Sequence, residues 1–301
     1  MRKAIVVGGA GFIGSHVVDA LIADGYAVEV IDDLSAGKRE NVNEKAMLHV
    51  LDMRDREAIE PLFEGADVVF HLAARPRVQY SIEHPDETND INIGGTVSVL
   101  MSAQRQGVRR VVYSASSSAY GNQETLPLVE SMQPDPLSPY GLQKYVGELY
   151  CKLFWDVYNL ETVSLRYFNV YGPRLDPEGP YALVIGKFLK QRSKGDPMTI
   201  FGDGENTRDY THVSDIVRGN VLAAVSDKVG KGEVLNLGAG RQVTVNELAE
   251  MIGGEVVHLE PRLEPKYTLA DTSKALELLG WEPTVKIEEG LAELKKEFGI
   301  A

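Results

Sequence analysis

Gly8-Gly9-Ala10-Gly11-Phe12-Ile13-Gly14 is the most informative motif for the fold of this chain. It follows a short apolar run, Ala4–Val7, and opens a helical pattern over Phe12–Asp24. Glycine permits a tight turn and lets a pyrophosphate approach the backbone, while the free N–H groups of the helix N-terminus attract the anion. Such a string alone could be an ordinary glycine turn, but its place between a strand and a helix predicts a dinucleotide-binding unit.

The acid after the second apolar run supports this interpretation. Asp32 lies at the spacing where a carboxylate accepts hydrogen bonds from the adenosine ribose hydroxyls, and Asp33 could share that role. A carboxylate there repels a 2′-phosphate, so the sequence favours NAD over NADP. Lys38 and Arg39 argue the other way, because cations nearby could accept that phosphate. Asp52, after a third short strand, could accept from the adenine amino group or be a solvated loop acid.

Short runs rich in β-branched residues alternate with longer helical patterns along the chain. The runs are apolar at consecutive positions, as expected for strands covered on both faces. They are Ala4–Val7, Val28–Ile31, Asp67–Leu72, Arg110–Ser114, Thr162–Phe168 and Glu233–Leu237. The first three long helical patterns are Phe12–Asp24, Asn89–Gln106 and Ser138–Tyr158. This alternation predicts an α/β fold with a Rossmann-like, doubly wound parallel sheet and right-handed crossovers.

The pattern changes after residue 168. The next forty residues are rich in Gly, Pro and aromatics and carry one helical pattern near Ala182–Lys194, and residues 242–301 carry two more. We therefore expect a second, smaller α/β lobe that binds the substrate. The predicted domains are an NAD-binding domain of 1–168 plus about 209–240, and a substrate lobe of 169–208 plus 241–301.

Composition excludes several classes of function. The 301-residue chain has a formal net charge of −13, which argues against nucleic-acid or anionic-membrane partners. No apolar run reaches the roughly 18 residues of a membrane span. The single cysteine, Cys151, cannot form an internal disulfide, which suits the cytoplasm. His71 and His212 do not stand at metal-ligand spacing, so no metal site is predicted.

A second motif carries candidate chemistry. Ser138-Pro139-Tyr140 predicts a helix start, which places Tyr140 and Lys144 on one helical face. A phenol, with a pKa of about 10, is a poor base, but a nearby ammonium group favours the phenolate and lowers that pKa. Such a tyrosine could take the proton of a substrate hydroxyl while hydride leaves the same carbon. A Tyr-x-x-x-Lys pair is common on exposed helices, but here the serine-rich Ser114–Gly121 precedes it at a strand end.

These motifs, in this order, resemble the extended short-chain dehydrogenase/reductase family. Within that family, the chain is similar to UDP-hexose 4-epimerases along nearly its whole length. The strings that carry the resemblance are Gly8–Gly14, Asp32-Asp33-Leu34-Ser35, His71-Leu72-Ala73-Ala74, Asn92-Ile93-Gly94-Gly95-Thr96, Ser116–Gly121, Tyr140-Gly141-Leu142-Gln143-Lys144, Arg166–Arg174, Gly202-Asp203-Gly204, Arg208-Asp209-Tyr210 and Ala270-Asp271-Thr272-Ser273-Lys274.

The resemblance implies a role for each matching residue. Tyr140 would be the acid/base, Lys144 its activator and ribose anchor, and Ser116 the second hydroxyl at the sugar oxygen. Asn169 and Arg208 would bind the phosphates of UDP. The implied NAD contacts are Gly8, Gly11, Phe12, Ile13, Gly14, Asp32, Asp33, Asp52, Met53, Leu72, Ala73, Ala74, Asn92, Ser114, Tyr140, Lys144 and Tyr167. The implied UDP-sugar contacts are Ser116, Ser117, Tyr140, Asn169, Phe201, Arg208, Arg262 and Thr268.

The resemblance also bears on the reaction and the assembly. Dehydratases and decarboxylases of the family carry an acid in the string where this chain has Ser116, Ser117 and Ser118, so a 4-epimerase is expected. The alternatives are a UDP-glucuronate 4-epimerase or related nucleotide-sugar oxidoreductase, and a non-catalytic NAD-sensing protein. The helical patterns Asn89–Gln106 and Ser138–Tyr158 would pair in a homodimer.

One position is implied to set the choice of sugar. In UDP-hexose 4-epimerases, the residue three before the aspartate of Ala-Asp-x-Ser-Lys borders the C2 substituent. That residue here is Thr268, whose small side chain would admit an N-acetyl group. The segment before it, Pro261–Pro265, is one residue shorter than the family's Arg-x-Gly-Asp string and lacks its glycine. A shift of one residue would place Tyr267 at the gate instead.

Overall fold

The main feature of the structure is a seven-stranded sheet in which all neighbouring strands are parallel. The computed structural model describes residues 2–76, 78–177, 183–261 and 266–300. The strand order is β11-β6-β5-β4-β1-β2-β3, which confirms the doubly wound prediction. The strands are β1 (Lys3–Val7), β2 (Ala27–Asp32), β3 (Met47–Val50), β4 (Ala66–His71), β5 (Arg110–Ser116), β6 (Glu161–Tyr167) and β11 (Lys231–Leu237).

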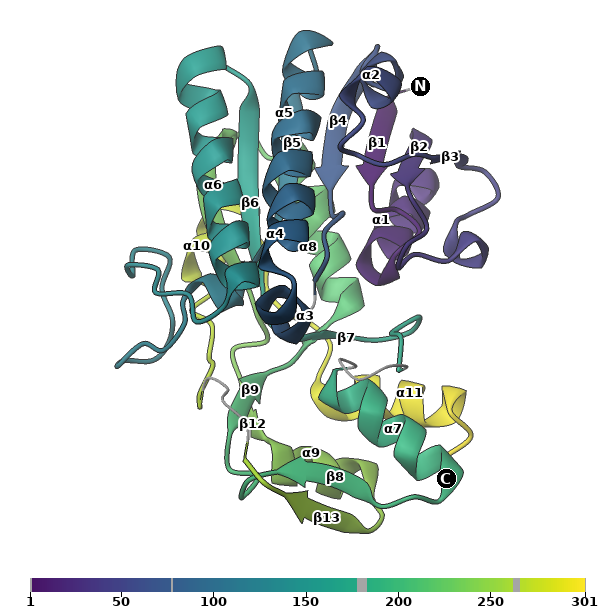
Figure 1. Ribbon diagram of the computed structural model, residues 1–301, viewed down its shortest axis with the longest axis vertical. Helices are drawn as coiled ribbons and strands as arrows, with labels where there is room; N and C mark the ends of the chain where they lie inside the picture. Colours follow the sequence, from purple (N-terminus) through teal and green to yellow (C-terminus); the bar gives the residue numbers. More distant parts are fainter. Residues whose placement is uncertain (1, 77, 178–182, 262–265, 301) are drawn as a thin grey trace.

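Helices cover both faces of the sheet, as Figure 1 shows for α5 and α6 on one side and α1 and α8 on the other. One face is packed by α1 (Phe12–Ala23), α8 (Val213–Val225) and α10 (Ser273–Leu279). The other is packed by α2 (Arg56–Ile59), η2 (Glu60–Phe63), α5 (Gly95–Arg105) and α6 (Pro139–Tyr158).

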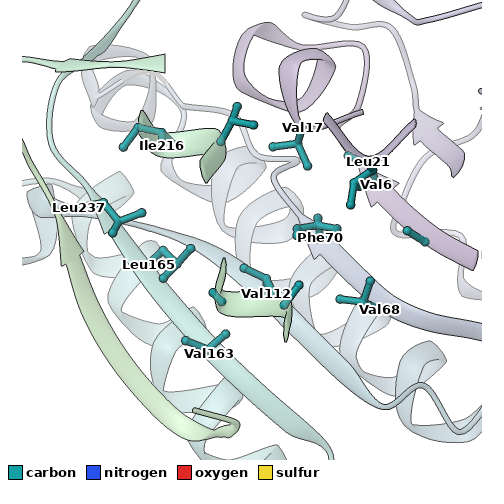
Figure 2. Packing of buried hydrophobic residues seen from close by; sticks show 14 of the residues in the cluster. Val6, Val17, Leu21, Val68, Phe70, Val112, Val163, Leu165, Ile216 and Leu237 are labelled. Carbon is teal, nitrogen blue, oxygen red and sulfur yellow. The ribbon is translucent and has the colours of Figure 1, made fainter. Parts of the chain in front are cut away.

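Neighbouring residues of one strand belong to opposite cores. Val6 packs with Val17 and Ile216 in the cluster drawn in Figure 2, whereas Ile5 packs in the cluster on the other face. Because successive side chains of a strand point to opposite faces, a strand covered twice needs apolar residues at every position. This requirement explains the consecutive apolar runs of the sequence.

The helical pattern predicted over Asn89–Gln106 is three elements in the structure. They are α4 (Pro85–Asn89), a single π-helical turn, η3 (Asp90–Gly94), and α5. The π turn inserts extra backbone into the helix and buries the Asn92 side chain. Such turns occur often at functional sites.

The smaller part of the molecule lies below the sheet in Figure 1 and has its own core. Its two-stranded sheets pair β7 (Val170–Tyr171) with β10 (Thr211–His212), β8 (Met198–Phe201) with β13 (Val256–Leu259), and β9 (Thr207–Asp209) with β12 (Gln242–Thr244). Its helices are α7 (Val184–Lys194), α9 (Val245–Ile252) and α11 (Ile287–Glu297).

The sequence pattern and the structure differ over residues 242–301. The pattern predicts two helices, whereas the structure has α9, α10 and α11. The extra helix, α10, does not join the smaller core, because Ala275, Leu279 and the fully buried Trp281 pack with the main sheet. Residues 241–301 are therefore shared between the two cores.

The remaining short elements connect the larger ones. They are η1 (Arg39–Asn41), α3 (Val78–Glu83) and η4 (Ser117–Ala119). Within the part of the chain that the structure describes, every helix is too short or too polar to cross a membrane.

Candidate active site

The glycine turn between β1 and α1 is packed too tightly for side chains. A Cβ on Gly8, which has a φ of +87°, would lie 2.5 Å from the backbone nitrogen of Ala73. A Cβ on Gly14 would lie 2.0 Å from the carbonyl oxygen of Gly8. Gly11 caps α1 without a side-chain hydrogen bond, and the first turn, which starts with Phe12 and Ile13, contains no acid. The free N–H groups of this helix start fit a pyrophosphate.

Asp32 lies beside this turn. Its two carboxylate oxygens accept hydrogen bonds from the backbone N–H of Ala10 and of Leu34, both at 2.9 Å. The residue is 8% exposed, and burial raises its pKa while the two N–H groups act in the opposite direction. Asp33 is exposed and binds the backbone N–H of Ser35 at 2.9 Å. Asp32, rather than Asp33, is therefore the acid built into the glycine turn.

Asp52 is neither alone nor freely solvated. Its carboxylate binds the guanidinium of Arg54 at 2.6 Å, and this bond lowers the pKa of Asp52. The same guanidinium binds Asp90 at 2.5 Å, which ties the loop after β3 to the π turn. Met53 is buried, and its side chain fills the space beside Gly95.

The end of β4 adjoins the glycine turn. The N–H groups of Leu72 and Ala73 both donate to the carbonyl oxygen of Val7, at 2.8 and 2.9 Å, and Ala74 follows them half-buried. The backbone N–H of the next residue, Arg75, donates to the side-chain oxygen of Asn92 at 2.7 Å.

Asn92 links this loop to α6. Its side-chain nitrogen donates to the Gln143 side chain at 2.8 Å, and Gln143 in turn donates to Thr88 at 3.0 Å. All three residues are buried. The π turn therefore fixes the position of α6 next to Lys144.

Tyr140 and Lys144 lie on the first turns of α6, which begins as predicted. The Ser138 side chain caps the helix by accepting from the backbone N–H of Gly141 at 3.1 Å. Lys144 is 3% exposed, and its ammonium donates to the carbonyl oxygen of Ser114 at 2.7 Å. The backbone N–H of Tyr140 donates to the buried Ser81 hydroxyl of α3 at 3.0 Å.

Ser116 ends β5 and faces α6. Its hydroxyl lies 2.7 Å from that of Ser118 and accepts from the Ser118 backbone N–H at 3.2 Å. Ser117 begins η4, so of the three consecutive serines only Ser116 lies on the strand. Tyr167 pairs with Ser116 in the sheet register, but its own hydroxyl donates to Asn220 of α8 at 2.9 Å.

The electrostatics of this group differ from the sequence-based expectation. Burial raises the pKa of Tyr140 to about 12, although the Ser116 hydroxyl acts in the opposite direction. Burial also lowers the pKa of Lys144 to about 8. The predicted lowering of the phenol pKa by Lys144 is therefore wrong for the chain by itself, because loss of solvent disfavours both charged forms.

The predicted substrate contacts of the smaller part form one connected group around β9. The Asn169 side chain donates to the carbonyl oxygen of Asp209 at 3.2 Å, and the backbone N–H of Asp209 donates to the Thr268 hydroxyl at 3.2 Å. Arg208, next to Asp209, donates to the carbonyl oxygen of Thr207 at 2.9 Å. This arrangement places Asn169, Arg208 and Thr268 together.

Two predicted contacts remain, Phe201 and Arg262. Phe201 ends β8, with the Lys187 ammonium 4.9 Å from the centre of its ring. Arg262 lies outside the described residues. Over residues 2–76, 78–177, 183–261 and 266–300, no cluster of three or more His, Cys, Asp or Glu side chains could hold a metal ion.

Comparison with known proteins identifies this arrangement. Residues 4–238 match the model of the NAD-dependent epimerase/dehydratase family. The chain belongs to that family.

Two solved epimerases share the fold of this family member closely. One is a UDP-glucose 4-epimerase of Thermotoga maritima with UDP-glucose, with 42% identity, a TM-score of 0.94, and 99% of this chain and 98% of that chain covered. The other is a UDP-N-acetylglucosamine 4-epimerase of Methanobrevibacter ruminantium in complex with UDP-N-acetylmuramic acid, with 40% identity, the same TM-score and the same coverage. A putative UDP-glucose 4-epimerase of Methanocaldococcus jannaschii is 40% identical over 295 residues, or 95% of each chain.

Sequence reasoning assigned no role to three polar residues of this epimerase-family site. Ser118 holds the Ser116 hydroxyl, and Ser81 holds the backbone of Tyr140. Asp209 is fully buried and accepts from three backbone N–H groups, those of Ala239 at 2.6 Å and of Gly240 and Ala270 at 3.0 Å. Its burial raises its pKa to about 6. The only sequence signal for Asp209 is its place in the motif that contains Arg208.

Proposed function

We propose that this protein is an NAD-dependent 4-epimerase of UDP-hexoses that interconverts UDP-glucose and UDP-galactose through a transient 4-keto sugar. One observation carries the proposal: Tyr140, Lys144 and Ser116 come together at the carboxyl end of β5, on the same edge of the parallel sheet as the glycine turn, and the adjoining string offers hydroxyls but no carboxylate. With NAD as the hydride acceptor, hydroxyl groups can carry the proton transfer that oxidation and reduction at C4 require, whereas loss of a C5 proton needs a base that these serines do not supply.

The chain's own residues divide the work as follows. Tyr140 accepts the proton of the sugar 4-hydroxyl and later returns it, and Ser116, held by Ser118, hydrogen-bonds the same oxygen. Lys144 supplies the positive charge behind Tyr140. Bound NAD supplies a hydride acceptor and a positively charged ring, which favours the phenolate that burial alone opposes. The glycine turn and Asp32 fit its pyrophosphate and ribose.

A direct assay tests this function. The purified protein is incubated with UDP-galactose, UDP-N-acetylgalactosamine or UDP-glucuronate, and the configuration at C4 is followed by proton NMR. We expect interconversion of the UDP-hexoses without net NADH formation. Turnover confined to UDP-glucuronate would favour the glucuronate 4-epimerase instead, and NAD binding without any exchange at C4 would favour a sensor.

We further propose that N-acetylated sugars are accepted. The structure bears on the choice between the two gate residues, since the Tyr267 side chain is 54% exposed while the Thr268 hydroxyl binds the backbone of Asp209. Thr268 also lies 3.5 Å from the side-chain nitrogen of Asn169. These contacts support Thr268 as the residue at the C2 substituent. The similarity to a UDP-N-acetylglucosamine 4-epimerase points the same way.

The variant Thr268→Tyr tests the gate. A bulky side chain in place of the threonine fills the space for the acetamido group, so we expect kcat/KM to fall far more for UDP-N-acetylgalactosamine than for UDP-galactose. The expected change in that ratio is about 100-fold, the upper range for a steric contact in a pocket. Tyr267→Thr is the matched control and should leave the ratio unchanged. If only Tyr267→Thr alters it, the gate is one residue earlier.

We also propose that the protein is a homodimer joined through α6. Four exposed apolar residues of that helix lie on one stripe, spaced seven, four and four residues apart, and are between 47% and 57% exposed. They are Leu142, Leu149, Leu153 and Val157. A second copy packing helix against helix would cover this stripe, which is unusual on a surface facing water.

Charge on that stripe is expected to separate the subunits. Leu149→Glu combined with Leu153→Glu places two carboxylates in the contact, so light scattering after size exclusion should give the mass of a monomer. Leu276→Glu, at a similarly exposed leucine of α10, is the control and should stay dimeric. A wild-type protein that elutes as a monomer would contradict the proposal.

We also propose which part of the chain binds each ligand, and in which compartment the protein lies. Residues 1–168 with about 209–240 hold NAD, and the smaller lobe of 169–208 with 241–301, apart from α10, holds the UDP-sugar. The cytoplasm suits the protein, because its one cysteine, Cys151, is buried and unpaired.

A further inference from the structure

Behind the Tyr140 and Lys144 pair lies a buried ion pair that the proposed reaction does not use. Glu148 follows Lys144 by one turn of α6, on the same helical face. Its two carboxylate oxygens accept from the Arg166 guanidinium of β6, at 2.8 Å from Nε and 2.7 Å from a terminal nitrogen. Both side chains are 3% exposed. The forked geometry fixes the carboxylate in one position.

Arg166 also contacts the aromatic ring of Tyr120. Its guanidinium lies 4.4 Å from the centre of the Tyr120 ring, whose hydroxyl donates to Asn236 of β11 at 2.7 Å. Burying two charges is costly, and an apolar pair of similar size often stabilises a fold as well or better. Fold stability alone therefore gives no reason for an ion pair at this place.

The protonation states of the groups around Lys144 give a reason for the buried ion pair. The groups that face Lys144, or neighbour it on its own helix, are His71 of β4, Tyr113 of β5, and Tyr140, Glu148 and Cys151 of α6. Burial lowers the pKa of His71 to about 3 and raises those of Tyr140 and Cys151 to about 12. Burial also raises the pKa of Tyr113. All four of these groups are therefore neutral near pH 7.

Glu148 is the remaining group. Burial raises its pKa, but the bonds from Arg166 act in the opposite direction, and a guanidinium that stays charged needs a carboxylate to complete the fork. Among these neighbours of Lys144, Glu148 is thus the group that stays negatively charged. Its charge opposes the lowering of the Lys144 pKa by burial.

We propose that Glu148 is a positioning residue of this active site, whose carboxylate, fixed by Arg166, keeps the Lys144 ammonium charged behind Tyr140. The inference rests on the proposed function, because only in that reaction does the charge of Lys144 serve Tyr140. It predicts that Glu148 acts on the pH range of the enzyme rather than on substrate affinity.

The test measures the pKa of Lys144 directly. Protein labelled with ¹³C at the lysine ε-carbon is titrated by NMR, and the Lys144 signal is assigned by its loss in Lys144→Met. We expect Glu148→Gln to lower the Lys144 pKa by about one unit. Glu161→Gln is the matched control, since Glu161 pairs with the buried Arg110 at the opposite end of β5 and β6. It should leave that pKa unchanged.

Kinetics supply the second readout. A lysine is charged below its pKa, so a pKa lowered from about 8 to about 7 removes charge mainly on the alkaline side. We expect kcat of Glu148→Gln to fall about fivefold near pH 8 and less than twofold near pH 6, with KM unchanged. Glu148→Asp, which keeps the charge, should recover part of the alkaline activity. A uniform loss at every pH would indicate a structural role only.

A second variant distinguishes a loss of folding from a change in the Lys144 pKa. If Glu148→Gln unfolds because Arg166 is left alone, Glu148→Gln combined with Arg166→Met leaves no unpaired charge and should shift the Lys144 pKa in the same direction. An unchanged Lys144 pKa in the folded variants overturns the inference. Because the titration needs no turnover, absence of epimerisation in the wild type would refute the proposed function without deciding the role of Glu148.

Discussion

Tyr140→Phe is expected to lower kcat for the interconversion of UDP-hexoses by about 10²–10⁴-fold, the usual contribution of a positioned acid/base. The phenol is the group of α6 that can take the 4-hydroxyl proton and return it. Phenylalanine keeps the ring and its packing but removes the hydroxyl that interacts with Ser116. The backbone N–H of residue 140 still donates to Ser81, so the helix start is preserved. Initial rates of C4 exchange, measured by NMR, give the size of the effect.

The control for this variant lies on the same helix. Tyr145→Phe removes a phenol from a half-buried position just after Lys144 and should leave kcat within about twofold. NAD binding, measured by isothermal titration, should be similar in both variants, because neither change touches the glycine turn. A Tyr140→Phe protein that exchanges C4 at the wild-type rate would move the active centre elsewhere.

The main sheet was predictable because its strands must be apolar on both faces. Ala4–Val7 contributes Val6 to one core and Ile5 to the other, so its every residue is constrained. The cap at Ser138 was also predictable, because serine is a preferred N-cap residue and proline is favoured in the first turn of a helix. These signals are local, and each depends on residues within a few positions of one another.

The parts that the sequence did not reveal depend on contacts between distant segments. The π turn around Asn92 is set by bonds to Arg75 and Gln143, and no local pattern reports them. The seven-residue α10 is too short for a clear periodicity, and its place is decided by packing on the main sheet.

The charges of the candidate site depend on burial in the same way. Spacing alone put Lys144 near Tyr140, but it could not show that both side chains lose solvent together, which raises one pKa and lowers the other. Glu148 and Arg166 are 18 residues apart in the chain and meet only because α6 packs on β6. The charge pattern of the sequence therefore identifies residues of the candidate site but does not predict their protonation states.

The second large effect is expected from Gly14→Ala, which should weaken NAD binding by about 100-fold. The added Cβ would lie 2.0 Å from the carbonyl oxygen of Gly8, a contact that side-chain movement cannot relieve because both partners belong to the backbone. Overpacking of this kind costs about 1–3 kcal/mol, and about 1.4 kcal/mol corresponds to tenfold in affinity. We expect the turn to relieve the strain by opening, which would move the N–H groups of α1 away from the position of the pyrophosphate.

Because the strain can be relieved by opening the turn, the loss should show in affinity more than in stability. Isothermal titration with NAD measures the first, and thermal unfolding of the same samples measures the second. Gly94→Ala is the control, since that glycine has helical φ and ψ of −57° and −48° and its Cβ would meet nothing closer than Asp90 at 3.4 Å. It should bind NAD as the wild type does. An unchanged affinity in Gly14→Ala would mean that the turn between β1 and α1 does not hold the cofactor, and the reaction assigned to Tyr140 would then lose its hydride acceptor.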